Sequence, residues 1–386
     1  MIIRGGRVYY HNQFLADHEV VIKDGLITAV QPNSLASADF HLKNDELLVP
    51  GFMDLHIHGA RGQDVMDANA TSLQILSDAL LEEGVVGYLA TTMTESIPKI
   101  EAALKTCFEF QRNQTQGAEL LGVHLEGPFL SQAFMGAQCG DHLKIPDIAL
   151  LKKWQQQFPD LIRLITIAPE LPHAIEFIQY ARSQNIVVSI GHTAANFAET
   201  KCGIDAGATH ATHLFNAMSG VHHREPGAAA ALLSDDRVIA ELIVDGAHVA
   251  PEMIQFTVQC KGLDHLLLVT DAMRAKCLKA GIYDLGGQNV AVDDYGIARL
   301  QSNGKLAGST LQLNKALKNM HQYTGLPLTE LIPLITIQPA SILKILNQGY
   351  ISSGQIANLV VLNNNFDVKG TFYHGKIVYQ CAKSTH

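Results

Sequence analysis

The sequence predicts an α/β protein: a (β/α)8 TIM-type barrel with a small β-sandwich domain formed by both chain ends. Through the middle of the chain, eight apolar strand-like segments alternate with segments of helical periodicity. At both ends, short strand-like segments are instead broken by turn residues such as Gly5–Gly6 and Asp24–Gly25. We therefore expect residues 1–49 and 347–386 to form the small domain and residues 50–346 to form the barrel.

The barrel elements follow one another in a regular order. The eight expected strands are Leu47–His58, Gly87–Thr92, Leu120–Glu126, Ile162–Ile167, Ile186–Ile190, Thr209–Phe215, Val238–Val244 and Leu266–Thr270. Helical periodicity marks Thr71–Glu83, Ile97–Gln114, Pro172–Ser183 and Pro251–Lys261. A turn-rich segment, 281–305, and a helical tail, 311–346, follow the last strand. A doubly wound sheet is the alternative, but it would not need eight strands.

Composition limits the classes of partner. The chain has 386 residues and a formal net charge of −9, which disfavours nucleic acid or an anionic membrane as its main partner. No apolar run is long enough to span a bilayer, and the first residues contain no apolar segment typical of a secretory signal. The six cysteines are scattered without a CxxC pair, as expected for free thiols in a reducing compartment. We therefore expect a cytoplasmic protein without nucleic-acid or membrane partners.

Side chains able to bind a metal or transfer a proton lie where the predicted strands end. In a barrel of this kind the catalytic groups gather at the C-terminal ends of the strands. Random scatter would also put such groups at the opposite ends or on helices. The six residues are His56, His58, Glu126, His192, His213 and Asp271.

The spacing of these residues favours a metal centre. His56 and His58 are two residues apart, so both imidazoles point to the same side of a strand and can bind one cation. Taken alone, such a pair is equally consistent with packing. Glu126 ends an apolar strand and needs a buried partner, either a cation or a salt bridge. Together with His192 and His213 it forms a usual ligand set for Zn²⁺, Fe²⁺ or Mn²⁺.

Asp271 has two interpretations, as a metal ligand or as a general base and acid. A divalent metal makes water more acidic, and a nearby carboxylate can accept the released proton and return it to a leaving amine. Two further histidines, His124 and His210, lie deeper on their strands, and we expect them to be structural.

Several motifs, in order along nearly the whole chain, carry a family resemblance. They are PGFMDLHIHG at 50–59, HLEGPF at 124–129, GHT at 191–193, THLFNAM at 212–218, HREPG at 223–227, DGAH at 245–248, TDA at 270–272 and LAGS at 306–309. The sequence resembles the N-acetylglucosamine-6-phosphate deacetylase family of the amidohydrolase superfamily. That resemblance implies a hydrolase that converts N-acetyl-D-glucosamine 6-phosphate to D-glucosamine 6-phosphate and acetate in amino-sugar catabolism.

The resemblance also implies roles for individual residues. Glu126, His192 and His213 would hold the principal metal, and His56 and His58 a second one, giving one or two divalent metals per chain. Asp271 would be the catalytic base and acid. Arg224, helped by His248, would bind the phosphate from the neighbouring subunit of a homodimer, since arginine offers paired donors to phosphate oxygens. The substrate-binding set would be Ala137, Asn216, Ala217, Arg224, His248, Leu306, Ala307 and Gly308.

One departure and three alternatives remain. Gln138 stands where relatives have a histidine that meets the sugar, and an amide cannot become charged. Dihydroorotase- or hydantoinase-like relatives bridge two metals with a lysine on the fourth strand, and residues 163–169 contain none. The galactosamine epimer of the substrate stays open. A barrel that only binds sugar phosphate would have no chemical need for Asp271.

Overall fold

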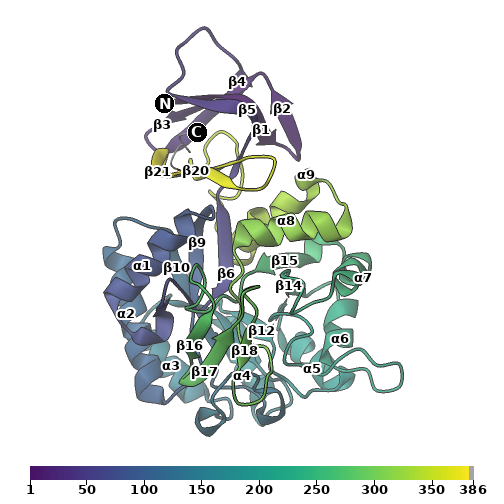
Figure 1. Ribbon diagram of the computed structural model, residues 1–386. Helices are drawn as coiled ribbons and strands as arrows, with labels where there is room; N and C mark the ends of the chain where they lie inside the picture. Colours follow the sequence, from purple (N-terminus) through teal and green to yellow (C-terminus); the bar gives the residue numbers. More distant parts are fainter. Residues whose placement is uncertain (382–386) are drawn as a thin grey trace.

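The computed structural model describes residues 1–381, and it contains a barrel and a smaller β structure built from both chain ends (Figure 1). The barrel sheet has eight strands in the order β15-β14-β13-β12-β11-β10-β9-β6, with parallel pairing throughout. The predicted (β/α)8 barrel is therefore confirmed. The strands are β6 (Phe52–Ile57), β9 (Val85–Thr91), β10 (Glu119–Glu126), β11 (Ile162–Ile167), β12 (Val187–Ile190), β13 (His210–Ala211), β14 (Ile239–Ile243) and β15 (Leu266–Val269).

The barrel closes between its first and last strands just beyond their C-terminal ends. The amide of Asp271 donates to the carbonyl of His56 at 2.8 Å, and the amide of His58 donates to the carbonyl of Ala272 at 2.8 Å. Residues of β6, β9 and β15 are buried along their full length, because helices cover the outer face and side chains fill the interior. The seam thus fixes His56, His58 and Asp271 next to one another.

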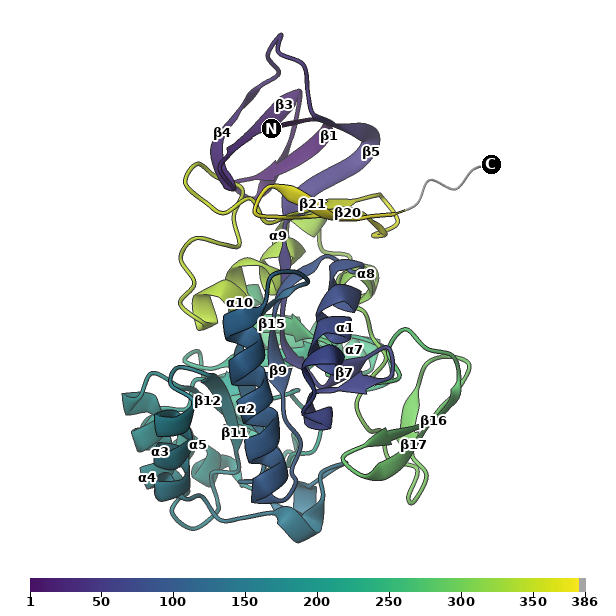
Figure 2. The same cartoon turned by 90° about the vertical axis from the view of Figure 1, so that its left-hand side faces the viewer.

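Helices surround the barrel (Figures 1 and 2). Their starts carry sequence signals: Asp147 caps α3 through the amides of Ala149 and Leu150, and Asn196 forms a capping box with Glu199 at α5. The helices are α1 (Ala70–Leu81), α2 (Ile97–Asn113), α3 (Ile148–Gln157), α4 (Ala174–Ser183), α5 (Phe197–Ala206), α6 (Ala228–Ser234), α7 (Pro251–Lys261), α8 (Leu313–Thr324), α9 (Leu328–Leu331) and α10 (Ile337–Ile342). None of the helices in the described chain is long and apolar enough to cross a membrane.

The smaller structure is one eight-stranded sheet, in which strands from both chain ends pair directly. Its central strand β5 runs parallel to β1 and antiparallel to β19. The strands are β1 (Ile2–Tyr10), β2 (Gln13–Ala16), β3 (His18–Lys23), β4 (Leu26–Pro32), β5 (Phe40–Pro50), β19 (Leu359–Leu362), β20 (Val368–Tyr373) and β21 (Lys376–Gln380). A separate apolar cluster stabilises it, with Ile3, Val20, Leu48, Val361 and Phe372 among its members.

Three sequence expectations need correction. The strand predicted over Leu47–His58 is two strands, β5 and β6, separated at Gly51, where an added Cβ would lie 2.5 Å from a methyl carbon of Val86. The strand predicted over Thr209–Phe215 is only β13, because the backbone turns at His213 and Phe215, which have positive φ.

The third correction concerns the segment predicted to be turn-rich, 281–305. It forms an antiparallel three-stranded sheet from β16 (Gly281–Leu285), β17 (Gln288–Val292) and β18 (Ala298–Leu300). In Figure 2 this sheet stands beside the barrel. Its own apolar cluster includes Met93 and Met273 from the barrel side. Two strands, β7 (Gly59–Ala60) and β8 (Gln63–Asp64), form a further hairpin.

Candidate metal centre and active site

The six side chains predicted from strand ends lie together inside the barrel mouth. The first group contains Glu126, His192 and His213. Oε1 of Glu126 lies 3.2 Å from Nε2 of His192 and 3.2 Å from Nε2 of His213, and the two imidazole nitrogens lie 3.1 Å apart. Each residue is at most 5% exposed. Two imidazole nitrogens and a carboxylate oxygen that converge in this way fit a divalent cation.

The second group lies on the other side of Glu126. Nε2 of His58 is 3.3 Å from Oε2 of Glu126 and 3.1 Å from Oδ1 of Asp271. Nε2 of His56 has no hydrogen-bond partner among the described residues, and it lies 3.5 Å from Oδ1 of Asp271. An unpaired buried nitrogen is costly unless a ligand uses it. The donor set of His56, His58 and Asp271 therefore fits a second cation, with Glu126 between the two groups.

The backbone of three site residues is strained. His192, His213 and Asp271 have φ values of 48°, 31° and 47°, which non-glycine residues rarely adopt. Each lies two residues after the end of its strand, where the chain must turn sharply while its side chain stays in the barrel mouth. Such conformations cost on the order of 1–3 kcal/mol each and cluster at functional sites.

Charge inside the group opposes the effect of burial. Burial alone raises the pKa of Glu126 and of Asp271, but the positive charge of His56 and hydrogen bonds from histidines lower both. For His58, burial lowers the pKa, whereas hydrogen bonds with Asp271 and Glu126 prevail and raise it to about 9. The carboxylates of Glu126 and Asp271 thus favour positive charge on or between the surrounding histidines. Either protons on the imidazoles or a bound cation can supply that charge.

Metal affinity should therefore depend on pH. Below about pH 9 both nitrogens of His58 carry a proton, and a cation that binds this imidazole must displace one of them, so metal affinity should increase as the pH rises toward about 9. One displaced proton corresponds to about tenfold per pH unit. Competition with a chelator between pH 6 and pH 9, corrected for protonation of the chelator, measures this. An affinity that does not change over this range would contradict the assignment of His58 as a ligand.

A cavity of about 380 Å³ opens over the two groups. His56 lies beneath it and does not line it. The predicted residues that line it are His58, Ala137, Glu126, His192, His213, Asn216, Ala217, His248, Asp271, Leu306, Ala307 and Gly308. The structure thus brings together every predicted metal and catalytic residue and every predicted substrate contact except Arg224.

Arg224 lies apart from this cavity, on an exposed segment between Met218 and α6. Its guanidinium contacts His223 at 2.7 Å and is not among the lining residues. In Figure 1 the loop before α6 extends outward from the barrel. Within one chain, the cationic residue that lines the cavity together with His248 is Lys305, which the sequence analysis did not single out.

Gln138 contacts a metal-ligand candidate directly. Its Oε1 accepts the amide of Thr94 at 2.6 Å, which turns its Nε2 toward Oε2 of Glu126 at 2.9 Å. Its side chain is nearly buried, at 3% exposure. Gln138 therefore holds the carboxylate of Glu126 instead of presenting a titratable group to the cavity. A polar residue in a loop gives no sequence signal for such a contact.

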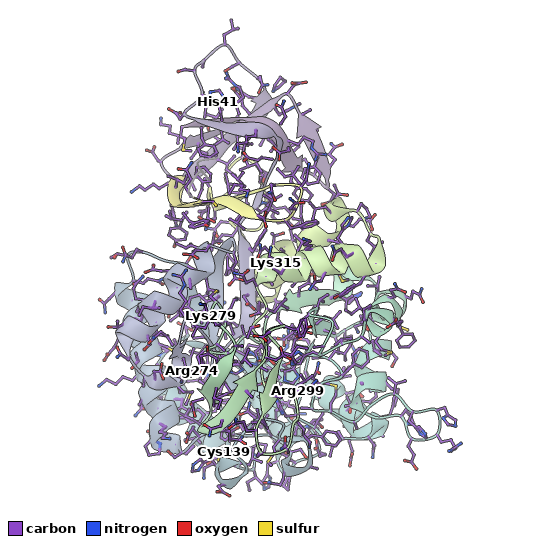
Figure 3. The ribbon with its side chains drawn as sticks, viewed as in Figure 1. His41, Cys139, Arg274, Lys279, Arg299 and Lys315 are labelled. Atoms are coloured by element: carbon purple, nitrogen blue, oxygen red, sulfur yellow. The ribbon has the colours of Figure 1, made fainter. Side chains whose placement is uncertain are left out.

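Contacts around the site fix its other groups. Nδ1 of His192 bonds the carbonyl of Phe134 at 2.9 Å, which leaves Nε2 free for the first group. His124 bonds Thr166 through Nε2 at 2.7 Å, below the site. Arg274, which follows the last barrel strand, pairs with Asp67 at 3.0 Å and with Asp284 of β16 at 3.7 Å. These ion pairs connect the β16–β18 sheet to the barrel. Figure 3 shows Arg274 beside this sheet and Arg299 on its strand β18.

Comparisons with known proteins agree with this geometry. Residues 47–378 match the amidohydrolase family. The chain is 38% identical to N-acetylglucosamine-6-phosphate deacetylase of Bacillus subtilis, over 98% of this chain and 97% of the relative. It is 34% identical to N-acetylgalactosamine-6-phosphate deacetylase of Escherichia coli O157:H7, over 97% and 98%. A variant of the Mycobacterium smegmatis N-acetyl-D-glucosamine-6-phosphate deacetylase, solved with N-acetyl-D-glucosamine-6-phosphate, superposes with a TM-score of 0.93 at 31% identity, covering 98% and 99%. The chain belongs to the amidohydrolase family.

Proposed function

We propose that this chain hydrolyses N-acetyl-D-glucosamine 6-phosphate to D-glucosamine 6-phosphate and acetate in the cytoplasm, as a step of amino-sugar catabolism. The observation that carries the proposal is the group of Glu126, four histidines and Asp271 under one cavity. Relatives from bacteria and mammals that carry the name N-acetylglucosamine-6-phosphate deacetylase support the substrate.

One or two divalent cations, Zn²⁺, Fe²⁺ or Mn²⁺, would polarise the acetamide carbonyl and make water more acidic. Glu126, His192 and His213 would hold the principal cation, and His56 and His58 the second. His192 and His213 both contact Oε1 of Glu126, and the carbonyl of Phe134 also holds His192, so these ligands need little reorganisation.

Asp271 would transfer the proton. Among the described residues that line the cavity, the carboxylates are Glu126 and Asp271, and Glu126 is engaged by two histidines and Gln138. Asp271 would accept a proton from the attacking water through its carboxylate oxygen and donate it to the departing nitrogen. Without that proton the nitrogen would have to leave as an amide anion, which is a very poor leaving group.

The sugar phosphate would be held at the outer part of the cavity. Nδ1 of His248 bonds Oδ2 of Asp245 at 2.7 Å, which leaves Nε2 available to a ligand. Asn216, Ala217, Leu306, Ala307 and Gly308, which line the cavity, would supply neutral polar and backbone contacts for the sugar. Arg224 would reach the phosphate from the neighbouring subunit of a homodimer, which its exposed position within one chain allows.

Arg224→Ala should weaken recognition of the phosphate. A charge-assisted bidentate contact is worth about 1.5–3 kcal/mol, so KM for the phosphorylated sugar should increase about 10- to 150-fold. KM for the unphosphorylated sugar should change little. Arg237→Ala is the matched control, because it removes another exposed arginine that does not line the cavity, and both KM values should stay close to those of the parent. An equal loss on both substrates would give Arg224 a general structural role.

Mixing variants tests whether the site is shared between subunits. A chain that carries only Arg224→Ala is co-expressed with a chain that carries only Asp271→Asn, so that mixed dimers form. A mixed dimer has one site with both residues intact, and activity at low substrate should recover above that of either variant alone. If no activity recovers although mixed dimers are isolated, Arg224 does not act across the interface.

Two other functions are separated by one assay. One relative, 34% identical, is an N-acetylgalactosamine-6-phosphate deacetylase, so the galactosamine epimer is the second candidate substrate. Acetate release is measured on both epimers, with and without the 6-phosphate, alongside metal analysis of the same preparation. Faster turnover of the glucosamine compound supports the proposal. Turnover restricted to the galactosamine compound would move the chain to that activity, and binding without turnover would make it a sugar-phosphate sensor.

A further inference from the structure

Glu241 is a carboxylate inside the barrel that the proposed mechanism does not use. It lies in the middle of β14 and is 0% exposed. An isolated buried charge is very unfavourable, so its partners determine what it can do. Among the described residues, the carboxylate of Glu241 has three polar partners, which are His56, His210 and the backbone amide of His213.

Each contact of Glu241 fixes one of these elements. Oε2 accepts from Nδ1 of His56 at 2.9 Å and from the backbone amide of His213 at 3.0 Å. Oε1 lies 3.2 Å from Nε2 of His210. Glu241 thus connects the first strand of the barrel with the loop that carries a ligand of the principal cation.

The contact with His56 determines which of its nitrogens can bind a metal. A carboxylate only accepts hydrogen bonds, so Nδ1 of His56 must carry a proton. Nε2 is then the nitrogen whose lone pair a cation can use, once the cation displaces any proton there. That Nε2 has no hydrogen-bond partner among the described residues and faces Asp271 and Glu126 at 3.5 and 3.6 Å. A carboxylate that orients a ligating histidine in this way also makes the imidazole a stronger ligand.

We propose that Glu241 is a positioning residue that sets the tautomer and orientation of His56 and thereby determines whether the second cation is bound. The proposal rests on the proposed function in placing a second cation at His56 and His58. Glu241 touches neither substrate nor cation in this role. The principal cation, held by Glu126, His192 and His213, depends on Glu241 only through the backbone of His213.

Glu241→Leu should therefore remove the second cation selectively. Loss of a carboxylate that supports a metal ligand typically costs 10- to 100-fold in affinity. Zinc titration followed by elemental analysis should give about two metals per chain in the parent, as the proposal requires. In Glu241→Leu the second binding step should weaken about 10- to 100-fold. The first step should change much less.

Two further variants separate positioning from folding. Glu241→Gln keeps an oxygen that can accept from His56 and His213, while its amide turns to His210. Nδ1 of His210 has no hydrogen-bond partner among the described residues, so its proton can move between the two ring nitrogens. The second step should stay within a few fold of the parent. Glu83→Gln is the control for lost stability, because Glu83 is 1% exposed and pairs with Lys276, and neither residue lines the cavity.

A spectroscopic measurement reports the tautomer directly. In the zinc-loaded parent labelled with ¹⁵N-histidine, His56 should show a protonated Nδ1 and a metal-bound Nε2. The Nδ1–H signal should disappear in Glu241→Leu and persist in Glu83→Gln. A role in stability alone would not move this signal.

The proposal is overturned if Glu241→Leu binds two cations as the parent does, or if the parent binds only one at saturation. It is also overturned if Glu83→Gln loses the second cation to the same extent. Failure of the proposed function is a separate result, because it appears as no acetate release by the parent from either sugar phosphate, whatever the metal titration gives.

Discussion

Asp271→Asn is expected to lower kcat for the acetylated sugar phosphate by about 10²–10⁴-fold, the usual contribution of general acid–base catalysis. Asparagine keeps the shape of the side chain but cannot accept a proton from water and return it to nitrogen. Asp271 faces the cavity, whereas Glu126 is held by His192, His213 and Gln138 and cannot replace it. Chemistry should therefore become rate-limiting, while KM changes little.

The measurement combines steady-state kinetics with metal analysis on one preparation. Oδ1 of Asp271 lies 3.1 Å from Nε2 of His58, so the assay is made at saturating metal to keep occupancy equal to that of the parent. The matched control is Asp235→Asn, which removes another nearly buried carboxylate, paired with Arg237 and remote from the cavity. Its kcat should stay close to that of the parent.

The pH profile gives a second check on Asp271. His56 and hydrogen bonds from His58 lower the pKa of this carboxyl below its ordinary value, although burial opposes them. The loss of activity that comes from protonation of Asp271 should therefore appear only at acidic pH, below the ordinary pKa of an aspartate. If the variant turns over within a few fold of the parent, another group transfers the proton.

Glu126→Gln is expected to lose bound metal and nearly all turnover. Glu126 is the residue that both ligand groups share, through Oε1 toward His192 and His213 and through Oε2 toward His58. A neutral amide removes the charge that attracts the cation, and one of its two positions must now be an NH₂ group.

The contact with Gln138 makes this substitution more severe. The amide of Thr94 holds Oε1 of Gln138, so its Nε2 keeps facing position 126 as a donor. An NH₂ group placed at Oε2 would face another donor, and placed at Oε1 it would face the two histidines. Elemental analysis after dialysis measures the loss. Glu170→Gln, which alters a carboxylate that bonds Thr193 outside both groups, should keep its metal. Full metal content in Glu126→Gln would show that the principal cation is not held by Glu126.

The sequence by itself determined the barrel and the order of its strands. Buried parallel strands read as continuous apolar runs, so β9, β10 and β11 could be located within a few residues. The period of two in a strand predicted that His56 and His58 face the same way, and both do face Glu126. These signals are local, because they depend only on neighbours along the chain.

Only the tertiary structure decided which distant residues touch these side chains. Glu241 lies 185 positions from His56 in sequence, and its contact exists because only β15 separates β14 from β6 in the closed barrel. Gln138 reached Glu126 because a backbone amide of another loop fixed its orientation. In both cases the decisive contact comes from chain segments that the fold brings together, and hydrogen-bond partners of a buried polar group leave no periodic pattern in the sequence.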